Sequence, residues 1–145
     1  MSEQKPCTNV TEAVPFYRVS DMPRSLAFYC DGLGFEVQER WVWEGTIRWC
    51  CLKRGGCRIM LQDCRWDDGS IHLPTEPQGK GVSLMVMCQD ALALYEEFLS
   101  RGLKPEAPFV GNGMWVVGLN DPDGFRTEFE SFTDVPEGTV LAARG

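Results

Sequence analysis

Residues 14–35 read VPFYRVSDMPRSLAFYCDGLGF, and residues 82–103 read VSLMVMCQDALALYEEFLSRGL. Each stretch opens with an apolar run, passes through an aspartate into a helical pattern and ends at a glycine. The two stretches align when the chain is shifted by 68 positions without a gap, and the same shift places Gly45 on Gly113 further along. The sequence therefore indicates an internal duplication.

The repeated unit is expected to contain one helix and four strands. A period of this length is too long for a solenoid repeat and too short for two independent domains, so the two copies should share one core. The pattern predicts an α+β fold of two tandem β-α-β-β-β modules whose strands form a curved mixed sheet around a concave cup. Strands are expected near residues 14–19, 35–43, 47–52 and 58–62, and again near 82–87, 103–110, 114–119 and 125–132, with helices from 20 to about 30 and from 91 to 101.

These elements divide the chain into a single domain, residues 1–145. The first module covers about residues 12–63, a linker rich in Asp, Gly and Pro covers about 64–80, the second module covers about 81–132, and residues 133–145 form a tail. We expect the linker to be an exposed connection.

Composition narrows the possible partners. With 43% hydrophobic residues in 145, the chain can bury a substantial core, and it contains no apolar run long enough to span a membrane. The start of the chain has no signal-peptide pattern, which predicts a cytoplasmic protein. A net charge of −7 argues against nucleic-acid and membrane partners. The seven cysteines are an odd number, and we expect them to be mostly reduced, buried thiols.

Several motifs resemble those of a known family. They are VSD at residues 19–21, FY at 28–29, GLGF at 32–35, and DPDG at 121–124 ahead of Glu128. Together they resemble the glyoxalase/bleomycin resistance/dioxygenase family, which has the vicinal oxygen chelate fold, over about residues 12–132. The resemblance implies paired β-α-β-β-β modules, and it implies a homodimer, because many short members form one with cups near the subunit interface.

Enzymes of this family hold a divalent metal through four strand positions, which correspond here to Val14, Met60, Val82 and Glu128. Only Glu128 carries a side chain that suits such a metal, and the sole histidine, His72, lies in the linker. We therefore expect no metal, no other cofactor and no catalytic residue of the metal-dependent type.

Strand alternation predicts which side chains line the cup. Phe16 and Arg18 share a face with Val14, and Arg58 and Gln62 share one with Met60. In the second copy Leu84 and Val86 share a face with Val82, and Arg126 and Glu130 share one with Glu128. The resemblance adds that Arg18 matches an arginine that binds substrate carboxylate in glyoxalase I-like members. Glu128 has two interpretations: it orients a ligand, or it forms a buried ion pair with Arg18, Arg58 or Arg126.

Five tryptophans are the other candidates for ligand binding. Some should fill the core, and others could stack on a flat ligand. Trp43 beside Glu44 and Trp66 beside Asp67 place aromatic faces near carboxylates, which suits a planar cation. The predicted ligand-binding set is Phe16, Arg18, Trp43, Trp49, Met60, Trp115, Arg126 and Glu128.

These residues favour a metal-free protein that binds a small molecule, for example by sequestering an antibiotic or another aromatic ligand. One alternative is a lyase, isomerase or dioxygenase of the same superfamily. A second alternative is a non-catalytic structural or partner-binding module with a collapsed cup.

Overall fold

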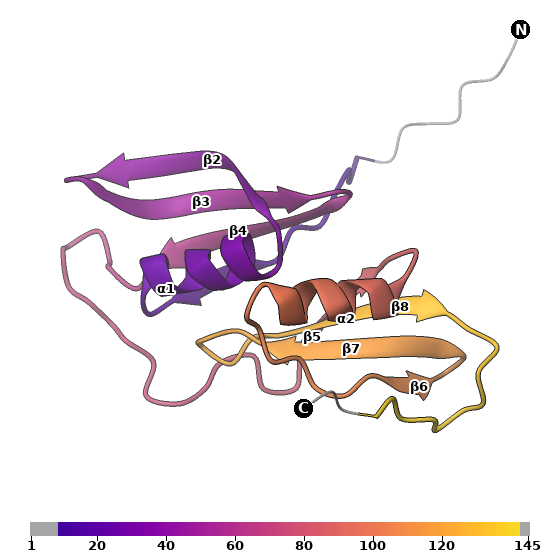
Figure 1. The fold of residues 1–145 in the computed structure, drawn as a ribbon. Coiled ribbons are helices and arrows are strands. Elements are labelled where there is room, and N and C mark those ends of the chain that lie inside the picture. Colours follow the sequence, from indigo (N-terminus) through magenta and orange to yellow (C-terminus); the bar gives the residue numbers. More distant parts are fainter. Residues whose placement is uncertain (1–8, 143–145) are drawn as a thin grey trace, which may run out of the picture.

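The computed structural model describes residues 9–142, and the strands in that range form two four-stranded mixed sheets (Figure 1). Each module pairs its first strand in parallel with its last, and the other pairs are antiparallel. This confirms the α+β fold and the paired modules. The first sheet has the order β1-β4-β3-β2 and the second β5-β8-β7-β6, with bounds β1 Phe16–Val19, β2 Glu36–Trp43, β3 Thr46–Arg54, β4 Cys57–Asp63, β5 Ser83–Met87, β6 Phe109–Gly111, β7 Met114–Asn120 and β8 Arg126–Phe132.

Both helical segments lie between the two sheets (Figure 1). The first consists of α1 (Met22–Leu26) and a π-helical continuation, η1 (Ala27–Gly32), and the second is α2 (Ala91–Ser100). Asp21 and Asp90 cap them, each accepting a hydrogen bond from the backbone amide three residues on. The sheet faces that point away from the helices are called the outer faces below. None of the helices in the described range is long and apolar enough to cross a membrane.

The second and third strands of each module are joined by the same tight turn. Glu44 and Gly45 have φ of 50° and 75°, and Asn112 and Gly113 have φ of 53° and 72°. Two consecutive left-handed residues make a type I′ turn, which matches the twist of a hairpin. The repeated glycine in the sequence therefore marks a repeated backbone geometry.

The helix-covered faces meet in one shared core. Across the seam between the modules, the Tyr29 hydroxyl donates to Asp121 at 2.8 Å, and the rings of Tyr17 and Phe125 stack with centroids 4.1 Å apart. Burial raises the pKa of the Asp121 carboxyl, although it accepts hydrogen bonds from Tyr29 and from two backbone amides. The two modules thus form a single folded unit.

The gapless repeat is wrong at the first strand of each module. Met60 and Glu128 are equivalent, 68 residues apart, but their register partners are Phe16 and Met85. The counterpart of Phe16 is therefore Met85, at a shift of 69. By the same register Ser83, not the predicted Val82, is the counterpart of Val14.

The extra residue is absorbed in the first helix. The segment from the cap Asp21 to Gly34 is one residue longer than that from Asp90 to Gly102. The wider π turns take up this residue, and Leu33 closes them by donating its amide to the Phe28 carbonyl at 2.9 Å.

The one-residue shift reverses the predicted faces of β5. Leu84 and Val86 pack against the core, so the face predicted for them is wrong. Met85 and Met87 take the outer face, where Met87 has 55% of its surface exposed. A slip of one residue moves every strand side chain to the opposite face.

The strand predicted near residues 103–110 is also shorter than expected. Only Phe109–Gly111 forms β6, because Pro105 and Pro108 cannot donate to a ladder. The tail, as far as it is described, packs on this strand, with the Val110 amide donating to the Thr139 carbonyl at 2.8 Å.

Candidate functional site

The outer face of the first sheet carries four of the residues predicted to bind a ligand. Phe16 is the register partner of Met60, and Gln62 pairs with Arg18 on one side and Trp49 on the other. Because paired residues point to the same face of a sheet, Phe16, Arg18, Trp49 and Met60 share this surface. Phe16 is 50% exposed, so the surface is apolar and accessible.

Arg18 lies at one end of this face. Its guanidinium is 5.3 Å from the ring centroid of Trp66, and Nη1 donates to the Asp63 carbonyl at 3.4 Å. Arg18 and His72 also line a hollow of about 450 Å³. Among the ion pairs of the described residues, none involves Arg18. Its charge is therefore available to an anionic group.

The tryptophans of β2 are engaged with a cation of their own chain. The Arg48 guanidinium lies 5.6 Å from the Trp41 ring centroid and 5.5 Å from that of Trp43. Arg48 is buried, and its Nε lies 2.8 Å from an Asp63 carboxylate oxygen. The ring face of Trp43 that could have stacked on a planar cation thus already contacts an arginine.

Arg126 and Glu128 lie on the outer face of the second sheet and bind each other. The Arg126 Nε donates to Glu128 Oε1 at 2.8 Å, and its two terminal nitrogens donate to the Glu106 carboxylate at 3.0 and 2.8 Å. These bonds raise the pKa of Arg126, and the same guanidinium lowers the pKa of Glu106. Of the two interpretations of Glu128, the structure contains the ion pair.

Trp115 does not join these residues. It is 9% exposed and belongs to the core cluster. Its register partner Ser131 accepts a hydrogen bond from the Ala91 amide at the start of α2, so this pair faces the helix. Seven of the eight predicted residues are thus divided between two outer faces and the core, and the eighth, Trp43, contacts Arg48 at the end of β2.

Glu130 is a residue that the predicted set omitted. It lies two positions after Glu128 on β8, on the same outer face, and is paired with Met87 on β5 and Val116 on β7. It is 6% exposed, and burial, followed by the charge of Glu128, raises its pKa. Strand alternation with Glu128 predicted this face for Glu130, although the predicted ligand-binding set left the residue out.

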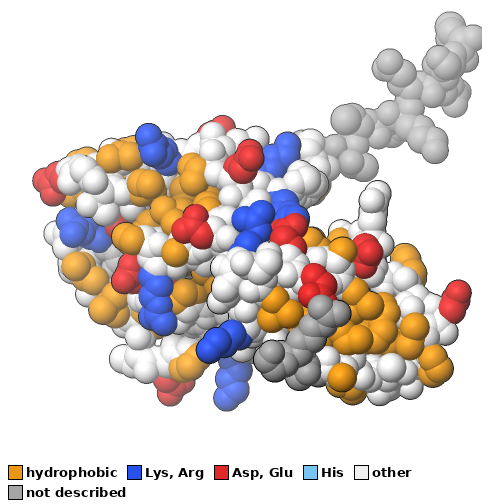
Figure 2. Space-filling model, viewed as in Figure 1, with side chains coloured by type: hydrophobic (Ala, Val, Ile, Leu, Met, Phe, Trp, Pro, Cys, Tyr) orange, Lys and Arg blue, Asp and Glu red, His pale blue; other side chains and the backbone are white. Residues whose placement is uncertain are grey.

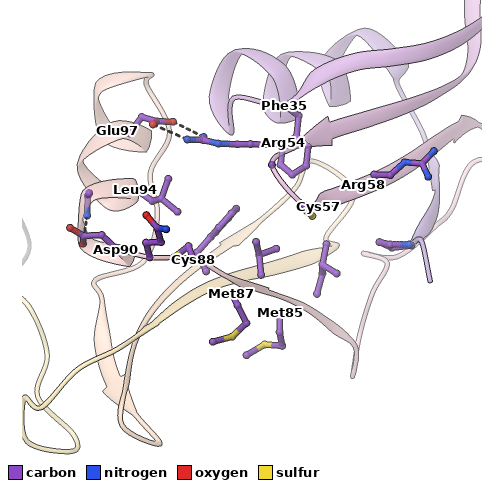
Figure 3. A pocket seen from close by; sticks show the side chains of 18 of the residues that line it. Phe35, Arg54, Cys57, Arg58, Met85, Met87, Cys88, Asp90, Leu94 and Glu97 are labelled. Atoms are coloured by element: carbon purple, nitrogen blue, oxygen red, sulfur yellow. Dashed lines mark hydrogen bonds and ion pairs between the residues drawn. The ribbon is translucent and has the colours of Figure 1, made fainter. Parts of the chain in front are cut away.

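A cavity of about 690 Å³ lies between the modules (Figure 3). It is bounded by the β3–β4 turn on one side and by β5 and the start of α2 on the other. None of the eight predicted ligand-binding residues lines it, but Arg58, Leu84 and Val86, which strand alternation also predicted to line the cup, do so. The sequence could not reveal it, because it arises from packing between elements that are distant in the chain. Its lining includes Phe35, Cys57, Met85, Met87, Cys88 and Leu94.

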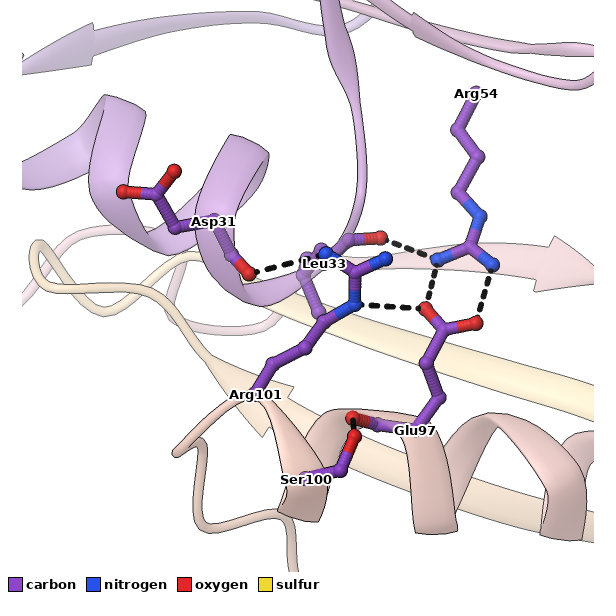
Figure 4. A network of polar contacts seen from close by, with 6 residues as sticks. All are labelled: Asp31, Leu33, Arg54, Glu97, Ser100 and Arg101. Atoms are coloured by element: carbon purple, nitrogen blue, oxygen red, sulfur yellow. Dashed lines mark hydrogen bonds and ion pairs between the residues drawn. The ribbon is translucent and has the colours of Figure 1, made fainter.

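Charged side chains gather along the seam between the modules, with hydrophobic side chains on either side (Figure 2). At the cavity, Arg54 donates to both oxygens of Glu97 at 2.6 and 2.9 Å and to the Leu33 carbonyl at 2.6 Å (Figure 4). Arg101 adds a contact of 3.2 Å to Glu97. The hydrogen bonds from Arg54 lower the pKa of Glu97. This ion pair is satisfied internally and ties the modules together.

The donor set for a metal is poor. Val14 and Met60 stand at two of the family's ligand positions, and Ser83 takes the place assigned to Val82. Within the described range, no three His, Cys, Asp or Glu side chains lie close enough together to hold a metal ion.

The model of the Glyoxalase/Bleomycin resistance protein/Dioxygenase superfamily matches residues 10–129. No curated protein matches the chain.

Solved structures share the fold at low identity. A bleomycin resistance determinant encoded on transposon Tn5 is 23% identical, with a TM-score of 0.65 over 85% of this chain and 98% of that one. The bleomycin-binding protein from bleomycin-producing Streptomyces verticillus, complexed with copper(II)-bleomycin, is 18% identical, with a TM-score of 0.62 over 88% and 100%. TnmS3, an antibiotic binding protein from Streptomyces sp. CB03234, is 19% identical, with a TM-score of 0.64 over 88% and 100%.

Proposed function

Because the chain belongs to the Glyoxalase/Bleomycin resistance protein/Dioxygenase superfamily, we propose that it is a small-molecule-binding protein that works without a metal. Its ligand is an antibiotic or another organic molecule with an aromatic part, and binding sequesters that molecule. The antibiotic-binding relatives of the same fold support this class of function.

The observation that carries the proposal is the exposure of large apolar side chains on the outer faces. Phe16 on the first sheet and Met85 and Met87 on the second are each about half exposed. Surfaces of this kind bind ligands or protein partners. Phe16 and Met85 are the register partners of Met60 and Glu128, which stand at two of the positions that the family resemblance assigns to the site.

Three of the four metal-ligand positions of the family carry side chains here that do not suit a divalent metal. A divalent ion needs several fixed nitrogen or oxygen ligands, and Val14, Met60 and Ser83 supply none that suits it. Glu128, the remaining position, is held by Arg126. Apolar side chains at these positions would instead contact a ligand's hydrocarbon or ring.

We further propose that two copies complete the cup as a homodimer in the cytoplasm. The two outer faces of one chain point away from each other, so neither can close over a ligand alone. A second copy would bring its second sheet to the first sheet of its partner. Unpaired Arg18 on one face and the carboxylates of the other are complementary in charge.

Native mass spectrometry with a panel of aromatic antibiotics, combined with elemental analysis, tests this proposal. We expect one organic molecule per protomer and no stoichiometric metal in protein purified without a metal-affinity step. Trp49→Ala should weaken binding at least tenfold by removing a stacking surface. Val140→Ala, which shortens an exposed apolar side chain of the tail, is the matched control.

Near-stoichiometric zinc, nickel, iron or manganese, lost together with activity on chelation, would overturn the metal-free function. If the Trp49→Ala variant and the wild type bind the ligand with equal affinity, the ligand does not bind on the outer face of the first sheet.

A further inference from the structure

Glu130 lies in an apolar part of the second outer face. Its register partners are Met87 on β5 and Val116 on β7. Its neighbours along β8, Phe129 and Ser131, face the core and the start of α2. The carboxylate therefore projects to the side on which the proposed ligand binds.

Two carboxylates on this face have opposite environments. Glu128 accepts a hydrogen bond from Arg126, and Arg126 is also bound by both oxygens of Glu106. The carboxylate of Glu130 has no hydrogen bond or ion pair with any side chain of the described residues; only its backbone carbonyl accepts bonds, from the amide and thiol of Cys88. The two residues are two positions apart on one strand, yet only one is neutralised.

Glu130 as a residue is 94% covered, and its carboxylate oxygens keep only a small contact with solvent. The carboxylate has therefore lost part of its hydration without gaining a donor from a described side chain, which is costly. A bound molecule with a charged donor would offset that cost. Met87 beside it is 55% exposed, and a methionine side chain can move to admit a ligand.

We propose that Glu130 binds a protonated amine or amidine of the ligand, and that this contact orients the ligand's apolar part against Met85 and Met87. The inference rests on the proposed function and narrows it to ligands that combine an aromatic body with a cationic group. Glu128 serves as a structural anchor for Arg126 instead.

The charge of Glu130 should make this contact dependent on pH. The titratable and charged groups near it are Glu128 and Arg126 on its own strand and Cys88 just after β5; its partner on β7, Val116, is apolar. The pKa of Glu130 is raised by burial, then by Glu128. Acidification should therefore weaken amine binding at a higher pH than an ordinary glutamate would.

The test uses two probes of nearly equal shape, 2-naphthylmethylamine, which is protonated at neutral pH, and neutral 2-naphthylmethanol. Binding is measured by quenching of tryptophan fluorescence and by calorimetry. We expect the wild type to bind the amine about tenfold more tightly than the alcohol, as a charge-assisted hydrogen bond would. Glu130→Gln should remove this preference while leaving alcohol binding unchanged, and the matched variant Glu128→Gln should keep it.

Equal binding of both probes by the wild type overturns the role of Glu130 while leaving the proposed binding function intact. Loss of the preference in Glu128→Gln as well as Glu130→Gln overturns it too, because a diffuse acidic field would then suffice. If the wild type binds zinc saturably without an organic probe and Glu130→Gln does not, Glu130 binds a metal rather than an amine, and the proposal is overturned. Failure of both probes and of the antibiotic panel to bind overturns the proposed function together with this inference.

Discussion

The seam between the modules and the outer faces of the sheets contain the same kinds of residue, but these residues are paired at the seam, whereas some on the outer faces lack a partner of opposite charge among the described residues. At the seam, polar groups are matched within the chain: Tyr29 donates to Asp121, and Arg54 binds Glu97 through two hydrogen bonds. On the outer faces, Arg18 lacks a carboxylate partner within the described residues, and Glu130 lacks a donor. Matched polar groups hold the fold, and unmatched ones are available to a ligand or a second copy.

Apolar side chains follow the same division. The aromatic rings of Tyr17 and Phe125 cover each other at the seam, whereas Phe16, one residue from Tyr17, is half exposed. Neighbouring residues of one strand thus serve stability on one face and binding on the other. Substitutions on the two faces should have separable effects.

The largest effect is expected at the seam. Asp121→Ala removes the acceptor for the Tyr29 hydroxyl and for the amides of Asp123 and Phe125, leaving buried donors without partners. We expect a loss of about 3 kcal/mol in the free energy of unfolding, measured by urea denaturation. Asp67→Ala in the exposed linker is the control and should change it by less than about 0.5 kcal/mol. A loss as small as the control's would mean that the seam depends on apolar packing alone.

A charge on the outer face should act on assembly. Phe16→Asp should weaken the proposed homodimer by about 100-fold, because a carboxylate would have to be desolvated at the interface. The free energy of unfolding of the monomer should change little, since Phe16 is half exposed. Sedimentation velocity at tens of micromolar measures the dimer, with Val140→Asp as the control. A wild type that is monomeric at this concentration contradicts the dimer itself.

The seam was predictable from the sequence in outline. Alternating apolar residues, the capping aspartates and the repeated glycines are local signals, and they placed both modules and a shared core. The same signals predicted the wrong faces for β5. The π turns of η1 contain one extra residue, and no residue propensity in the sequence indicates it. Since strands alternate with a period of two, this single residue reversed the faces of Leu84 and Met85.

The candidate site was less predictable, because it depends on partners distant in the chain. Alternation correctly grouped Phe16 with Arg18, but the pairing of Arg126 with Glu106 needs the irregular segment before β6 to fold back on the sheet. Trp115 and Trp49 look alike in sequence, and only the strand register separates a core residue from a surface one. The cavity between the modules has no local signature at all.

The two carboxylates of β8 provide a comparison within one face. Glu128→Gln breaks the hydrogen bond from Arg126 and should lower the free energy of unfolding by about 1 kcal/mol. Glu130→Gln removes a charge that has no partner among the described side chains. It should raise the free energy of unfolding at neutral pH by less than about 1 kcal/mol. The gain should shrink as the pH falls, because the raised pKa means that protonation in the folded state already relieves this charge. Urea denaturation at pH 7 and pH 5 measures both; two changes of the same sign would contradict the contrast.

The smallest effect is expected for the ion pair that closes the seam beside the cavity. Arg54 lowers the pKa of Glu97 below its ordinary value of 4.5, so the folded state favours the ionised carboxylate. This stability is fully present above the ordinary pKa and is lost as the pH falls through the lowered one. Both side chains are about a third exposed, which limits the contribution to about 0.5–1 kcal/mol. We expect Glu97→Gln to be less stable than the wild type by this amount at pH 6, and the difference to be smaller at pH 3, below the ordinary pKa of a glutamate. Urea denaturation of both proteins at the two pH values measures it, and groups such as Glu130 that titrate in both proteins cancel in the difference. A difference of unchanged size at low pH would show that Glu97 stabilises the seam by packing and neutral hydrogen bonds rather than by its charge.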